Sequence, residues 1–136
     1  MCLDVGEKRI GVAVSDPLGI TAQGIDVLQR KGIKKDLQQI RSYVDEYQAS
    51  ELILGLPLNM DGTKGEKAQE ILRLQAYLAK RLPVPVKTWD ERLTTVVAEK
   101  VLLDGDVTRA KRKKVIDKLA AVLILESYLQ FKRSSV

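Results

Sequence analysis

Histidine is absent from the 136-residue sequence, and cysteine occurs once, as Cys2. The lack of histidine excludes Ser-His and Cys-His nucleophilic sites, and also zinc sites with histidine ligands. One cysteine cannot form an intramolecular disulfide and supplies no metal-ligand cluster. If the chain is an enzyme, its chemistry must therefore use carboxylates, lysine, hydroxyl groups or a bound hard metal ion.

Long apolar runs are also missing, since none approaches the roughly 20 residues that a membrane-spanning helix needs. A strand pattern begins almost at once and leaves no room for a signal or transit peptide, so we expect a cytoplasmic protein with no membrane partner. Apolar residues make up 45% of the chain and charged residues 30%, which is typical of a soluble globular protein. The length fits a single domain over residues 1–136.

Acidic residues are outnumbered by basic ones, and the net charge of +5 favours anionic partners such as nucleic acid. The charge is concentrated in the stretch 108–114, which carries five positive charges in seven residues. Aromatic residues are few, so a platform for stacking bases is not expected.

Hydrophobic periodicity predicts three short strands followed by alternating helices and strands. The expected strands are 2–5, 9–15, 24–30, 51–56 and 86–89, and the expected helices are 34–47, 68–82, 94–104 and 114–131, the last preceded by a basic loop. In the second strand Gly11, Ala13 and Ser15 share one face, which suits close packing of a helix or another backbone. The order predicts an α/β fold: a five-stranded mixed sheet, an antiparallel meander and then parallel strands, with helices on both faces.

Asp4 is the first candidate for chemistry, because a carboxylate is disfavoured inside a strand and is costly to bury without compensation. A metal ion would compensate the charge, whereas an edge position facing water would need no function. The pair Asp90 and Glu91 follows the fifth strand, at the edge of the sheet where ligands gather. One of the two could instead be an ordinary N-terminal acid of the next helix, and the spacing does not say which one points inward.

Asp117 lies near the start of the last expected helix, with Ala120, Ala121 and Ile124 at i+3, i+4 and i+7. An acid at the head of a small, apolar stripe favours a functional role slightly over simple compensation of the helix dipole. Three carboxylates are what a Mg²⁺ or Mn²⁺ site needs, since hard cations prefer oxygen ligands. Two such ions could activate water for attack on a phosphodiester.

Two segments are candidates for holding a nucleic-acid backbone. The loop 55–65, which contains Asn59, leaves a strand and opens a helix, so its backbone N–H groups could receive a phosphate, although an ordinary turn explains it equally well. The basic run precedes Asp117 by a few residues, which would place its cations beside the site. The residues expected to bind nucleic acid are Arg9, Asn59, Arg109, Lys111, Arg112, Lys113 and Lys114.

Four segments resemble the YqgF family, also called RuvX, and the resemblance covers nearly the whole chain. They are LDVGEKRIGVAVSD (residues 3–16), GLPLNMDGT (55–63), DERLTT (90–95) and KVIDKLAA (114–121). The resemblance implies an RNase H-like fold. It also implies that Asp4, Glu91 and Asp117 are the catalytic, metal-binding acids, and so favours Glu91 over Asp90. The first strand begins a few residues earlier in most members.

The resemblance implies a nuclease that acts on structured RNA or branched DNA with Mg²⁺ or Mn²⁺, with two ions expected. The leading expectation is processing of the 5′ end of small-subunit (16S) precursor ribosomal RNA, and the alternative is resolution of Holliday junctions, which requires two active sites and hence a homodimer. Two other classes stay open. One is a catalytically silent nucleic-acid-binding module, and the other is an ATP-dependent phosphotransferase, which would need two such domains.

Overall fold

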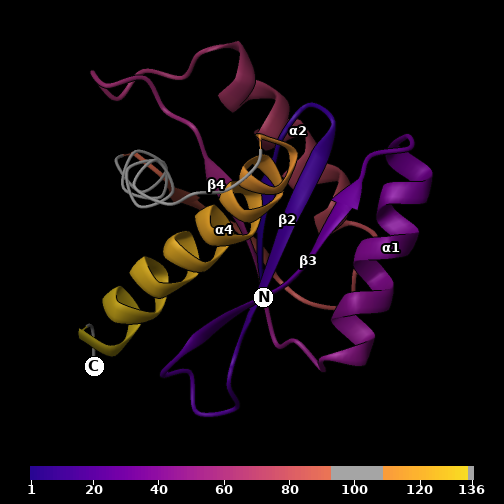
Figure 1. Cartoon of the computed structure of the whole chain (residues 1–136), viewed down its shortest axis with the longest axis vertical. Helices are drawn as coiled ribbons and strands as arrows, with labels where there is room; N and C mark the ends of the chain where they lie inside the picture. The colour runs from indigo at the N-terminus through magenta and orange to yellow at the C-terminus, as the bar shows by residue number, and fades with distance from the viewer. Residues whose placement is uncertain (93–108, 135–136) are drawn as a thin grey trace.

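A computed structural model describes the backbone of residues 1–92 and 109–134, and the side chains of residues 1–92 and 118–133. Its elements form one sheet with helices on both faces (Figure 1). The elements are β1 (Cys2–Val5), β2 (Arg9–Ser15), β3 (Ala22–Gln29), α1 (Ile33–Glu46), β4 (Leu52–Leu56), α2 (Glu66–Ala79), β5 (Val86–Asp90) and α4 (Arg109–Ser134). The helix expected over 94–104 lies outside the described residues.

The sheet has the strand order β3-β2-β1-β4-β5. The first three strands pair antiparallel, while β1 with β4 and β4 with β5 pair in parallel. The predicted mixed sheet is therefore confirmed. Because β1, β4 and β5 run in the same direction, their carboxyl ends meet at one edge of the sheet.

Two separate apolar cores lie on the two faces of the sheet. Helices α1 and α2 cover one face, where Leu3 and Val5 of β1 pack among their side chains. Helix α4 crosses the other face (in front of the sheet in Figure 1), where Cys2 and Ile53 pack against Ile124. Since side chains alternate along a strand, Asp4 shares the α4 face with Cys2.

The small residues of the meander let α4 approach the sheet closely, as the sequence predicted. Ala13 is fully buried in the core beneath α4. A Cβ atom built on Gly24 would lie 3.3 Å from Lys118 Cβ and 3.4 Å from Val122 Cγ2. Small side chains on β2 and β3 therefore set the depth at which the helix sits.

One prediction about the last helix was wrong. The basic run was expected to form a loop, but α4 already begins at Arg109 and includes it. Alanine, lysine and arginine are strong helix formers, and no glycine or proline interrupts residues 109–114. Among the described residues, no helix is long and apolar enough to cross a membrane.

Candidate active site

Asp4 and Glu91 come together at the edge of the sheet where the parallel strands end. Asp4 lies near the end of β1, and Glu91 follows β5 directly, with its backbone N–H donating to the carbonyl of Leu56 at 3.2 Å. Strand β4 separates β1 from β5. The two carboxylates must therefore reach across β4 to approach each other.

Gly55 of β4 provides the space for this approach. A Cβ atom at this position would collide with Glu91 Oε2 and lie 2.8 Å from Ile124 Cδ1. The Glu91 side chain thus lies directly over the backbone of β4, beneath α4. A glycine at position 55 is required here by contact and not by backbone conformation.

Glu91 lies close enough to Asp4 for the charge of Asp4 to act on its carboxylate. Burial raises the pKa of Glu91 to about 7, and the negative charge of Asp4 acts in the same direction. Lys67 opposes the rise, and Asp90 adds a smaller contribution to it. Two carboxylates held together in a partly buried place repel each other, and a cation between them would relieve this repulsion.

The structure shows which of Asp90 and Glu91 points toward Asp4, a question that the spacing in the sequence did not answer. Asp90 turns outward and pairs with Arg92, whose Nη2 lies 2.6 Å from Asp90 Oδ2 and whose Nε donates to the same oxygen at 2.8 Å. Hydrogen bonds from Arg92 lower the pKa of Asp90, outweighing its partial burial. Glu91 is therefore the member of the pair that lies beside Asp4.

The third expected acid, Asp117, lies in α4, but its side chain is outside the described residues. The same holds for the five basic residues of the run, Arg109, Lys111, Arg112, Lys113 and Lys114. The residues that follow Asp117 at i+3, i+4 and i+7 are Ala120, Ala121 and Ile124, all fully buried. The apolar stripe predicted for this helix is thus present where the structure describes it.

Arg9 and Asn59, the other two residues expected to bind nucleic acid, occupy different settings. Arg9 is the first residue of β2 and half-buried, and its carbonyl accepts the N–H of Gly6 at 2.8 Å. Asn59 is exposed, but its side-chain amide donates to Thr63 Oγ1 at 2.9 Å. Asn59 therefore organises the 57–65 loop, and a contact of either residue with nucleic acid stays a prediction.

The donor set at this edge suits a hard divalent cation. Asp4 and Glu91 offer carboxylate oxygens, which Mg²⁺ and Mn²⁺ prefer, and their mutual repulsion favours a bound cation. The part of the chain with described side chains contains no group of three potential ligands. The third ligand expected from the sequence is Asp117, whose side chain is not in that part.

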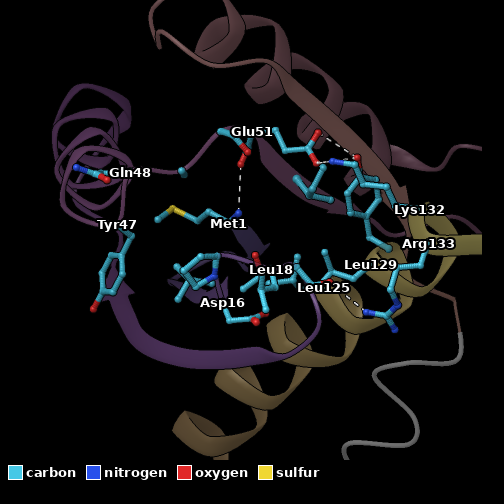
Figure 2. A pocket seen from close by; sticks show the side chains of 18 of the residues that line it. Met1, Asp16, Leu18, Tyr47, Gln48, Glu51, Leu125, Leu129, Lys132 and Arg133 are labelled. Atoms are coloured by element: carbon cyan, nitrogen blue, oxygen red, sulfur yellow. Dashed lines mark hydrogen bonds and ion pairs between the residues drawn. The ribbon is translucent and has the colours of Figure 1, made fainter. Parts of the chain in front are cut away.

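A second cavity lies at the opposite end of the sheet (Figure 2). It has a volume of about 890 Å³, and Met1 before β1 and Glu51 before β4 line it. Figure 2 shows the Met1 amino group directed at Glu51, to whose carbonyl it donates at 3.2 Å. Because Asp4 lies near the other end of β1 and Glu91 follows the other end of β5, this cavity is separate from the paired acids.

Sequence reasoning missed Gly55 and Lys67 as parts of the site. Lys67 is the second residue of α2, directly after the 57–65 loop, and its charge acts on Glu91. The loop-to-helix junction was the available signal for Lys67. Gly55 gave no such signal, because its role depends on the path of Glu91 across β4.

The order and directions of the five strands, with helices on both faces, define an RNase H-like domain. Solved structures with this fold agree. The chain matches T. thermophilus RuvC bound to a Holliday junction with a TM-score of 0.58 and 13% identity, covering 98% of this chain and 94% of that one. It matches the fowlpox virus Holliday junction resolvase, in complex with junction DNA, with a TM-score of 0.53 and 14% identity, covering 96% and 95%.

Sequence comparison shows the family to which the chain belongs. The model described as "RuvX: Holliday junction resolvase" matches residues 1–131. Relatives named "Putative pre-16S rRNA nuclease" include those of Syntrophomonas wolfei, at 54% identity over 95% of this chain and 92% of the relative, and Desulforamulus reducens, at 50% over 95% and 94%. The chain belongs to the RuvX family, and its enzyme class is nuclease.

Proposed function

We propose that this protein is a divalent-metal-dependent nuclease that processes the 5′ end of 16S precursor ribosomal RNA in the cytoplasm. The observation that carries the proposal is that Glu91 lies over Gly55, close enough to Asp4 for the charge of Asp4 to act on it. The names of relatives about 50% identical to the chain support ribosomal RNA as the substrate.

Asp4, Glu91 and Asp117 are the residues that would hold Mg²⁺ or Mn²⁺, with two ions expected. Such ions polarise a phosphodiester and lower the pKa of a bound water. The spacing of Asp117 supports its inclusion, because Ala121 and Ile124, four and seven residues further along α4, pack onto the sheet.

The basic residues of the chain would bind the nucleic-acid backbone and orient it at the acids. The five cations of the basic run, which continue α4 toward its N-terminus, would neutralise backbone phosphates near the acids. Arg9 would add a contact from β2. The burial that raises the pKa of Glu91 also limits the access of bulk water to its carboxylate.

Asp4→Asn tests the catalytic assignment. We expect cleavage of a precursor 16S RNA fragment in Mn²⁺ to fall by roughly a hundredfold or more, because one acid of the pair is lost. Asp45→Asn, at an exposed acid of α1, is the matched control and should cleave like the unaltered protein. Undiminished cleavage by the Asp4→Asn variant would sink the assignment.

Resolution of Holliday junctions is the second candidate function, and the description of the matching family model favours it. Parallel cleavage assays on a four-way DNA junction and on precursor 16S RNA distinguish the two candidate functions. Faster cleavage of the junction, at paired and symmetric positions, would replace the first proposal. Tight binding of both substrates without any metal-dependent cleavage would instead indicate a binding module.

A further inference from the structure

A groove begins where β1 ends, on the face of the sheet opposite α4. Its volume is about 420 Å³, and its walls are the β1–β2 turn at Gly6, the start of α1 at Ile33, and one face of α2 from Lys67 to Tyr77. Val5, the neighbour of Asp4, is one of its lining residues. The groove therefore leads away from the paired acids around the edge of the sheet.

Arg30 is held in place at this groove by two contacts. Its Nη1 donates to the Gly6 carbonyl at 3.0 Å, and its Nε donates to Asp36 Oδ2 at 3.3 Å. Asp36 is only 3% exposed and also accepts the backbone N–H of Lys31 at 2.9 Å. A buried carboxylate thus fixes the guanidinium, while the side chain of Arg30 stays 29% exposed to solvent.

Lys67 and Arg73 place two more cations along the α2 wall, and both side chains are exposed. Lys67 also lies close enough to Glu91 for its charge to act on that carboxylate. It therefore connects the groove to the acids. Glu7 and Glu70 also line the groove, and Asp36 pairs with Arg30, so three carboxylates match the three cations in formal charge. The groove therefore suits single phosphates held by individual cations and not a long phosphate backbone.

The groove also has an apolar surface. Ile33 is 45% exposed although it is a large aliphatic residue, and Ile71 and Leu74 form the buried part of the wall. Tyr77 also lines the groove, and the guanidinium of Arg81 lies 3.7 Å from the centre of its ring. Apolar contacts flanked by cations fit a base and sugar together with the adjoining phosphates.

We propose that this groove binds unpaired nucleotides of the substrate strand next to the cleaved bond, with Arg30, Lys67 and Arg73 on their phosphates. The inference rests on the proposed nuclease function, and it narrows the substrate to nucleic acid with a single-stranded segment beside a paired region. The volume of about 420 Å³ supports this reading, because the space is too small for a duplex and can take one base and sugar, with the adjoining phosphates on the surrounding cations.

Binding in EDTA tests the groove without cleavage. The probes are a short fluorescent RNA hairpin and the same hairpin with a few unpaired nucleotides at either its 5′ or its 3′ end. We expect one extension to tighten binding roughly tenfold. The gain should vanish in Lys67→Glu/Arg73→Glu and persist in Lys80→Glu, a charge change at the far end of the same helix.

Two results would overturn the proposal: no gain from either extension, or a gain that survives in the Lys67→Glu/Arg73→Glu variant. If that variant does not fold, photocrosslinking of 4-thiouridine in the extension to the unaltered protein decides, because crosslinks should map to peptides of α2 or the β1–β2 turn. Crosslinks elsewhere would refute the groove. Undiminished cleavage by the Asp4→Asn variant would remove the catalytic assignment of Asp4 and leave this binding result intact. Absence of metal-dependent cleavage by the unaltered protein would remove the nuclease function and would also leave the binding result intact.

Discussion

Gly55 decides where Glu91 lies, since any side chain at position 55 would occupy the place of the Glu91 carboxylate. The position of each acid relative to its own strand could be read from the sequence. The approach of the two acids to each other could not be read from it, because β4 lies between β1 and β5 and has no side chain at Gly55. The choice of Glu91 over Asp90 came from the family resemblance, and the outward pairing of Asp90 with Arg92 agrees with it.

Gly55→Ala should lower nuclease activity by roughly a hundredfold, because the new methyl group displaces Glu91 and presses on Ile124. We expect the added methyl to cost about 1–3 kcal/mol of unfolding free energy, as overpacked cores do. Initial rates and urea unfolding measure the two effects. Val44→Ala is the matched control, since Val44 of α1 is buried in the core on the other face of the sheet, where its truncation lowers stability without touching the acids. Equal loss of activity in both variants would contradict this role of Gly55.

Among the elements, helix α4 is bonded to both β5 and the start of β4 through side-chain hydrogen bonds. Trp89 of β5 donates from Nε1 to Ser127 Oγ at 3.1 Å, and Tyr128 donates to Glu51 at 3.0 Å. The sequence predicted this helix and its apolar stripe, but not its true start at Arg109, because a dense run of positive charges is typical of a solvated loop. Helix propensity outweighed that signal. Helical continuity keeps the basic residues on the element that carries Asp117.

The basic run therefore gives a prediction about α4. Lys113→Gln/Lys114→Gln should weaken binding of structured RNA about equally for all sequences, because phosphate contacts carry no sequence information. The slope of log K against log salt should fall by about one per lost phosphate contact. Titrations in EDTA at several salt concentrations measure both quantities. Lys80→Gln, at the C-terminal end of α2, is the control, and a double variant with an unchanged slope would refute the contact.

Glu51 gives a pH-dependent prediction, because it joins the start of β4 to β5 and α4. Its burial raises the pKa, but hydrogen bonds from Lys132, Lys87 and Tyr128 outweigh this and lower the pKa to about 2. Since the folded pKa lies below the ordinary value of 4.5, the contribution is present above pH 4.5 and is lost as pH falls toward 2. Lys87 and Lys132 are largely exposed, so solvent screening reduces it to about 1 kcal/mol.

Urea unfolding of Glu51→Gln between pH 7 and pH 3 measures this contribution. The variant should be less stable at pH 7, and the difference should shrink as the pH falls. Glu46→Gln, at an exposed acid that also lines the cavity of Figure 2, is the control. A difference that does not change with pH would show that the ion pairs contribute nothing.

At the scale of the whole molecule, the fold places two different surfaces at one edge of the sheet. The acids and the α4 face lie on one side, and the groove between α1 and α2 lies on the other, with Lys67 near both. The mixed sheet and its helical layers followed from the order of the elements in the sequence. The groove did not, because it joins residues of the β1–β2 turn, α1 and α2 that only tertiary packing brings together.

The assembly state that activity requires separates the two candidate functions. A single cut in precursor ribosomal RNA needs one active site, whereas symmetric resolution of a junction needs two. If the protein acts on ribosomal RNA, the cleavage rate should rise in proportion to enzyme concentration through the range where sedimentation shows a monomer. Mixing active protein with an excess of the Asp4→Asn variant should then leave that rate unchanged, apart from competition for substrate. A rate that rises with the square of enzyme concentration and is suppressed by the inactive variant would show that a dimer is required, and would favour the junction.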